Sequence, residues 1–278
     1  MSAAATKGAV PLPSATVVLA REAPSAPEIL LVQRHADTSF GATHVFPGGL
    51  LEPCDRVSHG HCIGERAGRA DTCLGVDSGA LDYYSAAVRE LFEETGVLLA
   101  RGPGGDWAWT ATCGRADEFD AVRKQLNAGD LSWPEILRDY RLQIDCDALH
   151  YFAHWITPVR RPKRFTTRFF AAVLPGDQCA THDGGELTDS CWMTAQQALE
   201  ADRSGHIALP PPTRATLHEL TAMTDAGELL RWAARREAEG VQSVLPVIVS
   251  DKGRERIVMP GSPDYPAGSP EPGSEANR

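Results

Sequence analysis

Three glutamates fall within five residues of one another in the stretch RELFEET, which begins at Arg89 and contains Glu90, Glu93 and Glu94. On a helix, residues three and four positions apart share a face, so the three carboxylates are expected to lie close together. Carboxylates this close raise one another's pKa unless a positive charge lies between them. Two positive partners are open: Arg89, about 100° round the helix, or a divalent metal ion. The alternative interpretation is a solvated helix surface.

The segment before this helix supplies further oxygen atoms. The run VFPGGLLEPCD predicts a short strand that ends in a loop at Gly48 and Gly49, with Glu52 and Asp55 close behind. Such a loop can turn the carbonyl of Gly48 toward the carboxylates. Mg²⁺ and Mn²⁺ prefer oxygen ligands and keep water in their remaining coordination positions. The pattern therefore favours a site at which a metal ion activates water.

Hydrophobic periodicity predicts the elements that must hold these residues. Apolar residues recur at helical spacing through 83–95, and Gly96 is a stop signal for that helix. Shorter apolar runs predict strands at 15–20 and 29–34, at HVFPGG, and in YFAHWIT and RFFAAVL. A further helix is expected in TAQQALEADRSG. Together these elements indicate an α/β protein.

Shifts in composition divide the chain into segments. The expected segments are a flexible N-terminus (1–14), a main domain (15–210) with a glycine-rich insertion (56–81) and a helical insertion (101–150), C-terminal helices with a hairpin (211–261), and a disordered tail (262–278). In the helical insertion, Phe119, Val122 and Leu126 share a face, and Ser132 followed by Pro134 marks a second helix start. The C-terminal hairpin, with its turn at 251–253, could pair across a homodimer.

Charge and composition exclude several classes of function. The net charge of the 278 residues is −10, which argues against a broad nucleic-acid surface. No apolar run approaches the roughly 20 residues needed to span a bilayer, and the N-terminus lacks the apolar core of a secretory signal. Seven cysteines are scattered without a C-x-x-C pair, as expected of free thiols. A cytoplasmic location without a membrane or nucleic-acid partner is therefore predicted.

Two half-motifs in this chain resemble the Nudix box. Gly49 is followed after five residues by Asp55, where the family usually has Glu, and RELFEETGV at 89–97 matches the second half completely. Residues 56–88 separate the halves, 33 residues where the family has seven, an excess of 26. A branch similar to the peroxisomal CoA diphosphatases carries an insertion at this place. The resemblance extends through LLVQR, HVFPGG, HWITPVRRPKRFTTRFF and ELTDSCW, and so covers most of residues 15–210.

The resemblance implies a Nudix α/β/α sandwich with a mixed central sheet, helical insertions and a C-terminal extension. It also implies hydrolysis of a diphosphate with Mg²⁺ or Mn²⁺. The metal ligands carried over are Gly48, Glu90, Glu93, Glu94 and, with one carbon fewer than the family's Glu, Asp55. Arg89 would position a glutamate, and Glu90 and Glu93 would be catalytic. Glu186, in GGELTDSCW, is either a water-activating glutamate or a solvated loop residue.

The resemblance also suggests residues that could bind the substrate. VRRPKRFTTRFF places Arg160, Arg164 and Arg168 in a basic cluster that could hold the 3′-phosphate of CoA or the diphosphate, or could simply balance local acids. Arg34 is a further phosphate candidate. Phe46 and Trp155 could stack on adenine, although aromatic residues on strands are more often core.

FPGGLLEPCD also resembles the FPGG-x-x-D-x-x-D signature of CoA-cleaving members, with Glu52 for the first Asp. CoA or acyl-CoA, cleaved to 3′,5′-ADP and (acyl-)phosphopantetheine, is therefore the favoured substrate. The alternatives are a pyrophosphatase for ADP-ribose, NADH or a nucleotide sugar, and a non-catalytic nucleotide sensor. Sensors of this kind usually lose box glutamates, and all three helix glutamates are present here.

Overall fold

The computed structural model describes residues 9–34, 43–109, 115–176, 178–181, 187–251 and 254–269. At its centre lies a mixed sheet of strand order β10-β2-β1-β9-β8-β11, with β3 paired to β2 and β4 paired to β1. The strands are β1 (Leu12–Arg21), β2 (Glu28–Arg34), β3 (His44–Val45), β4 (Gly48–Leu50), β8 (His150–Ile156), β9 (Phe165–Val173), β10 (Leu187–Thr194) and β11 (Ser243–Val244). β1 runs parallel to β9 but antiparallel to β2 and β4, so the predicted mixed sheet is confirmed.

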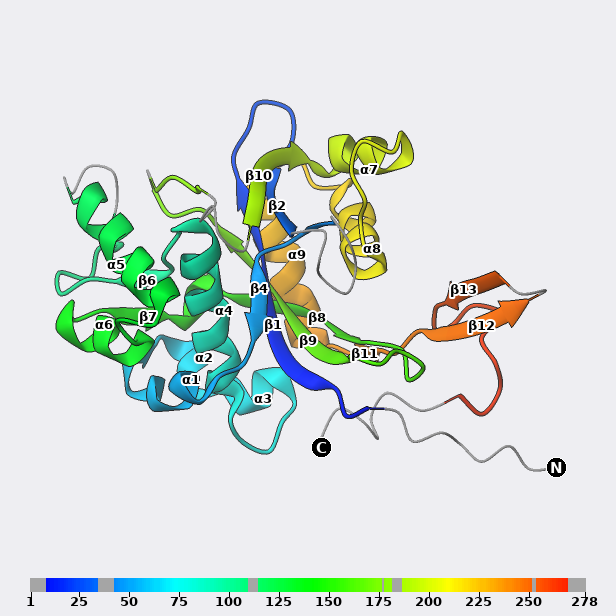
Figure 1. The fold of residues 1–278 in the computed structure, drawn as a ribbon, viewed down its shortest axis with the longest axis horizontal. Helices are drawn as coiled ribbons and strands as arrows, with labels where there is room; N and C mark the ends of the chain where they lie inside the picture. The colour runs from blue at the N-terminus through cyan, green and yellow to red at the C-terminus, as the bar shows by residue number, and fades with distance from the viewer. Residues whose placement is uncertain are drawn as a thin grey trace.

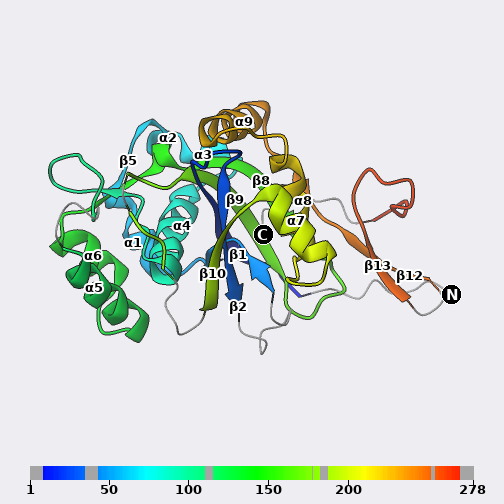
Figure 2. The ribbon, with the colours of Figure 1, turned by 90° about the horizontal axis from the view of Figure 1, so that it is seen from above.

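Helices cover both faces of this sheet. Alternate residues of β1 point to opposite faces: Val17 and Leu19 pack in the cluster that contains α4 (Ala80–Thr95), and Val18 and Ala20 pack in the other cluster. That second cluster contains residues of α7 (Ala195–Arg203), α8 (Pro211–Leu220) and α9 (Ala226–Glu239). Figure 2 shows α4 on one side of the sheet and α7 and α8 on the other. The expected α/β/α sandwich is therefore confirmed.

Helix α4 is the predicted helix of residues 83–95, begun three residues earlier at Ala80. Leu91 and Phe92 are fully buried, and burial of side chains of this size stabilises a fold by roughly 1.5–3 kcal/mol each. Gly96 ends the helix in the left-handed conformation at φ 74°, and its N–H donates to the carbonyl of Phe92. The buried apolar face fixes the helix against β1, which leaves the glutamates on another side.

The two segments expected to be insertions meet each other. Segment 56–81, for which no period was visible, begins within the short helix α1 (Pro53–Val57), continues through η1 (His59–His61), α2 (Glu65–Gly68) and α3 (Ala70–Leu74), and ends within α4. Between η1 and α2, β5 (Cys62–Ile63) pairs in parallel with β7 (Gln143–Asp145), which also pairs with β6 (Ala100–Arg101). The Asp147 carboxylate then accepts hydrogen bonds from the backbone of Glu65 and Arg66, at 2.9 and 2.8 Å. The two segments are thus joined through a small sheet of their own.

The second segment contains α5 (Ala116–Ala128) and α6 (Trp133–Asp139), which confirms both helices predicted there. α6 starts with a capping box in which the Ser132 and Glu135 side chains bond each other's backbone, as Ser132 indicated. The prediction that this segment is helical as far as residue 150 is wrong, because strand β7 and the start of strand β8 follow α6. The partners of β7 lie at 62–63 and 100–101, so local periodicity could not reveal this strand.

The C-terminal hairpin is present as β12 (Val247–Asp251) and β13 (Arg254–Val258), and it extends away from the sandwich in Figure 1. Ser243 and Val244, expected in that hairpin, pair instead with β8 at the edge of the central sheet. At the two ends, residues 12–14 belong to β1, and the Tyr265 hydroxyl donates to the Leu245 carbonyl at 2.8 Å, so these residues are ordered against expectation. None of the helices in the described ranges is long and apolar enough to cross a membrane.

Candidate active site

Arg89 lies at the centre of the site with its side chain 2% exposed. An arginine side chain has five N–H donors, and Arg89 uses all five. The bonds run from Nε and Nη2 to the two oxygens of Asp55 (3.1 and 3.0 Å), from Nη2 to the Leu50 carbonyl (2.9 Å), and from Nη1 to Glu90 Oε1 (3.0 Å) and Glu93 Oε2 (3.1 Å). With no donor left over, Arg89 positions carboxylates and has none to offer a substrate.

Asp55 faces inward and is fully buried. Besides Arg89, its oxygens accept from the Ser85 hydroxyl at 3.0 Å and from the backbone N–H of Glu52 at 2.8 Å. The Ser85 hydroxyl in turn accepts from the indole Nε1–H of Trp133 at 3.0 Å. Asp55 is absent from the lining of the pocket beside it, so the geometry does not support the expectation that it is a metal ligand. Its short side chain, in the first turn of α1, contacts Arg89 and does not extend to the pocket.

Gly48 and Gly49, the first two residues of β4, lie beside two of the glutamates. The Gly48 N–H donates to Glu94 Oε2 at 2.9 Å. Gly48 has φ +150°, and a Cβ there would lie 2.2 Å from the carbonyl oxygen of Ala15. A Cβ on Gly49 would lie 2.4 Å from the Glu90 carboxyl group. The loop predicted at these glycines is therefore wrong, because both belong to β4 and pair with β1. Their backbone forms a glycine cradle for the carboxyl groups, and at Gly48 the backbone of β1 leaves no room for a side chain.

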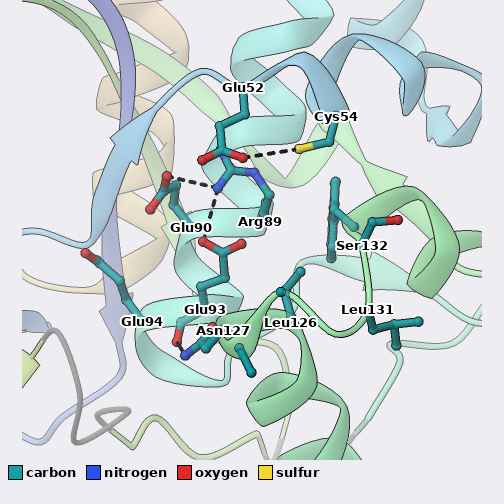
Figure 3. A pocket seen from close by; sticks show the side chains of 13 residues that line it. Glu52, Cys54, Arg89, Glu90, Glu93, Glu94, Leu126, Asn127, Leu131 and Ser132 are labelled. Atoms are coloured by element: carbon teal, nitrogen blue, oxygen red, sulfur yellow. Dashed lines mark hydrogen bonds and ion pairs between the residues drawn. The ribbon is translucent and has the colours of Figure 1, made fainter.

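A pocket of about 640 Å³ opens between α4 and the α5–α6 segment. Four carboxylates line one side of it, and residues of the stretch 126–133 line the other, as Figure 3 shows. The carboxylates are those of Glu52, Glu90, Glu93 and Glu94. The pocket thus has an acidic side and a largely apolar side that face each other, and Arg89 also lines it.

The acidic side carries more negative charge than Arg89 can neutralise. Burial raises the pKa of Glu93 to about 7, an effect that Arg89 opposes and Glu90 strengthens. The donors are all carboxylate oxygens, the type that a hard divalent cation prefers. Within the described ranges no three Asp, Glu, His or Cys side chains already form a closed ligand set, so the fit lies in the donor chemistry and the glycine cradle. Glu90, Glu93 and Glu94 are the residues that could hold such an ion.

The three arginines expected to bind substrate are not brought to this pocket. The Arg160 Nη1 donates to the Ile248 carbonyl in the hairpin at 3.3 Å, and its Nη2 lies 3.6 Å from Glu255. The buried Arg164 donates to the carbonyls of Thr157 and Ala9 at 2.9 and 2.8 Å. Both side chains hold chain segments together. They do not line the pocket beside α4.

Arg168 is also buried, 2% exposed, with its guanidinium 4.3 Å from the ring centroid of Tyr83. It neighbours His154, whose pKa burial lowers to about 3, with the Arg168 charge acting in the same direction. This environment lies between β8, β9 and the start of α4. The predicted basic cluster is therefore three separate structural sites.

The predicted stacking residues belong to the core. Phe46 is 2% exposed and contacts Phe169 edge to face at 6.5 Å between ring centroids. Trp155, 8% exposed, packs in the same cluster. Arg34 is the last residue of β2, and its side chain lies outside the described residues, as does the whole of Glu186.

The sequence did not indicate that α5 and α6 contribute one side of the pocket. The Arg123 Nε and the Asn127 side-chain amide both donate to the Glu93 carbonyl, at 2.9 and 3.2 Å, and so attach α5 to the end of α4. The helix start at Ser132 was visible in the sequence. No local pattern indicated that this helix pair faces Glu90.

The chain matches the family model described as the NUDT19 Nudix domain over residues 65–221 and the NUDIX domain over residues 10–119. The chain is also similar to proteins named acyl-coenzyme A diphosphatase NUDT19. The one from Xenopus laevis is 25% identical over 271 residues, covering 86% of this chain and 71% of that protein. The one from Homo sapiens is 27% identical over 277 residues, covering 85% and 72%.

Among solved structures, a NUDIX hydrolase from Alicyclobacillus acidocaldarius is 26% identical with a TM-score of 0.63, covering 80% of this chain and 96% of that one. The fold and the carboxylate site define a Nudix hydrolase. Within that class, the match over more than half of its length shows that the chain belongs to the NUDT19 Nudix domain family.

Proposed function

We propose that this chain hydrolyses the diphosphate of CoA or acyl-CoA, releasing 3′,5′-ADP and (acyl-)phosphopantetheine. The observation that carries this proposal is the Arg89 network, which orders Glu90 and Glu93 beside the glycine cradle in a pocket large enough for an organic substrate. The names of the relatives, acyl-coenzyme A diphosphatase, support the choice of substrate.

Nudix hydrolases generally depend on a divalent cation. We propose Mg²⁺ or Mn²⁺, held by Glu90 and Glu94 with Glu93 and the Gly48 carbonyl beside them. When bound, such a cation neutralises the diphosphate and makes water a better nucleophile at neutral pH. Asp55 is proposed as a positioning residue for Arg89, because both of its oxygens are already used inside the protein.

The protein's own groups hold the carboxylates in place before substrate arrives. Arg89 fixes Glu90 and Glu93, and the Gly48 N–H fixes Glu94. Fixed carboxylates need not reorganise during the reaction, which is the usual source of electrostatic catalysis. The proton of the attacking water would pass to Glu93, which lines the pocket, or to Glu186. Parallel Glu93→Gln and Glu186→Gln variants would identify the base by the larger loss of kcat.

The test is a product assay on purified protein with Mg²⁺ or Mn²⁺, offering CoA, acetyl-CoA, ADP-ribose and NADH in parallel. Release of 3′,5′-ADP from CoA and acetyl-CoA, with the other two left intact, is the expected result. Preferential cleavage of ADP-ribose or NADH would keep the site and discard CoA. If all four substrates stayed intact, the enzyme proposal would fail.

We also propose a location and an assembly for the chain. The cytoplasm is the proposed location, to be checked by imaging a tagged full-length chain. A homodimer through the β12–β13 hairpin is the proposed assembly. Size-exclusion chromatography with light scattering should then give twice the 30.0 kDa mass of one chain, and a mass of one chain would contradict it.

A further inference from the structure

The side of the pocket opposite the carboxylates is built almost wholly from one short stretch, residues 126–133, called here the insertion wall. Leu126, Ala128 and Leu131 give it apolar surface, and Gly129 adds no side chain. The polar side chains of this stretch that line the pocket are already bonded: Asn127 donates to the Glu93 carbonyl, the Ser132 hydroxyl donates to Glu135 at 2.6 Å, and the Trp133 indole donates to Ser85. Asp130 belongs to the stretch but does not line the pocket. Figure 3 shows Leu126 and Leu131 across the pocket from the glutamates.

The insertion wall is held at a fixed position relative to the carboxylates. Arg123 and Asn127 anchor its first part to the Glu93 carbonyl, on the same helix as the catalytic carboxylates. Trp133, 1% exposed, anchors its far end through the hydrogen bond to Ser85. Any group bound between the wall and the glutamates therefore has a defined distance from the diphosphate site.

Charge indicates which half of a CoA molecule this space can accept. Among the described residues that line it, Arg89 is the single cationic side chain, and all five of its donors are used. A 3′-phosphate placed here would face four carboxylates with no guanidinium or ammonium donor to receive it. An uncharged, partly apolar chain meets no such penalty and gains by covering Leu126 and Leu131.

We propose that the insertion wall binds the uncharged pantetheine arm and the acyl chain, so that the nucleotide half lies on the other side of the diphosphate. The pocket, at about 640 Å³, is within the range of roughly 300–1,000 Å³ typical of sites that enclose drug-sized molecules. This inference rests on the proposed CoA diphosphatase activity. It adds that segment 126–133 selects substrates by the length of the acyl chain.

The test compares kcat/KM for CoA and for dodecanoyl-CoA in three variants. Ala128→Trp fills the pocket from an exposed position at the end of α5, and Leu131→Gln makes the wall polar. Ala121→Trp, on an exposed position of α5 that does not line the pocket, is the matched control. A hydrophobic pocket distinguishes substrates that differ by one apolar group by about 10-fold or more. The kcat/KM for dodecanoyl-CoA divided by that for CoA should therefore fall about tenfold in both wall variants.

Unchanged thermal unfolding midpoints establish that the variants fold, and the exposed Ala128 makes this the expected result for Ala128→Trp. A ratio within about twofold of wild type in the wall variants, with CoA still cleaved, would overturn this inference and leave the proposed function intact. The same tenfold fall in Ala121→Trp would also overturn it. Wild-type protein that leaves CoA intact would overturn both the proposed function and the inference.

Discussion

Helix α4 and the basic stretch, residues 160–168, both concentrate like charges within a few residues, yet they end in different kinds of place. On α4 the helical period collects Glu90, Glu93 and Glu94 around one pocket, with Arg89 bridging two of them. The basic stretch runs through a turn into β9, and its arginines separate to the hairpin, the chain start and the sheet interior. Charge density in a sequence therefore indicates a site only where the local structure keeps the charges on one face.

Burial alone does not distinguish the two regions. Arg89, Arg164 and Arg168 are each 2% exposed. The difference lies in the partners: Arg89 holds carboxylates that reach the pocket, whereas Arg164 holds backbone carbonyls and Arg168 covers a tyrosine ring. The comparison predicts that changes at the α4 glutamates remove activity. Changes in the basic stretch should alter stability or have no measurable effect.

The largest effect is expected from Glu90→Gln. Loss of this carboxylate removes a proposed metal ligand and a partner of Arg89, so kcat for CoA should fall about a thousandfold with little change in fold. Steady-state release of 3′,5′-ADP measures it, and Glu239→Gln, on an exposed position of α9, is the control. A variant that keeps more than about a tenth of wild-type kcat would remove α4 from the catalytic role. If Glu90→Gln abolished turnover but kept the affinity for the nucleotide, nucleotide binding would not depend on Glu90 as a metal ligand.

Arg89→Met should mainly destabilise the fold. It leaves the fully buried Asp55 carboxylate without its charge partner, and uncompensated buried charges of this kind cost about 3 kcal/mol or more. Urea unfolding measures the free energy. The double variant Arg89→Met with Asp55→Asn should recover part of the loss. Arg203→Met, whose exposed pair with Glu200 is on α7, should stay within about 0.5 kcal/mol of wild type.

Much of the carboxylate site was predictable because its determinants are local. The helical period of α4, the stop at Gly96 and the glycine pair Gly48–Gly49 are all visible in short windows. The structure has the helix and its stop in the expected place, but it puts the glycine pair in strand β4 and not in a loop. The long strands and the C-terminal hairpin were visible for the same reason.

The remainder depends on contacts between distant residues. Strand β7 exists because residues 62–63 and 100–101 meet it, and the insertion wall faces Glu90 because Trp133 reaches Ser85. The partners of the basic stretch are mainly backbone carbonyls and a tyrosine ring, with one exposed carboxylate, and all come from distant parts of the chain that no local charge pattern reveals. Whether Asp55 pointed to the pocket or to Arg89 was likewise decided by packing.

The basic stretch should show itself in the acid stability of the protein through His154. Burial, aided by Arg168, lowers the pKa of this histidine to about 3, and its Nε2 lies 2.7 Å from the Thr166 hydroxyl. In the unfolded chain this histidine binds a proton below about pH 6.5, whereas in the native state it stays neutral down to about pH 3. Its contribution to the free energy of unfolding is therefore fully present above pH 6.5 and decreases as the pH falls toward 3. At pH 5 the loss from this residue is about 2 kcal/mol relative to pH 7.5.

Urea unfolding of wild type and His154→Gln at both pH values isolates the contribution. The variant should lose about 2 kcal/mol less than wild type between pH 7.5 and pH 5. Equal losses in the two proteins would show that His154 is protonated in the native state. Arg168 would then not be a buried neighbour that opposes its charge.

The smallest effect, and the sharpest test of the comparison, is expected from Arg160→Gln. This side chain is 57% exposed and lies 3.6 Å from Glu255, an arrangement worth within about 0.5 kcal/mol, so stability should hardly change. The ratio of kcat/KM for CoA to that for dephospho-CoA should stay within about twofold, because Arg160 is bonded to the hairpin and does not line the pocket. Arg231→Gln, whose exposed side chain lies 3.6 Å from Asp225, is the matched control. A tenfold fall in that ratio for Arg160→Gln alone would return the basic stretch to the role of phosphate reader. It would also mean that the hairpin held by Arg160 lies next to bound substrate, which brings the two compared regions into one site.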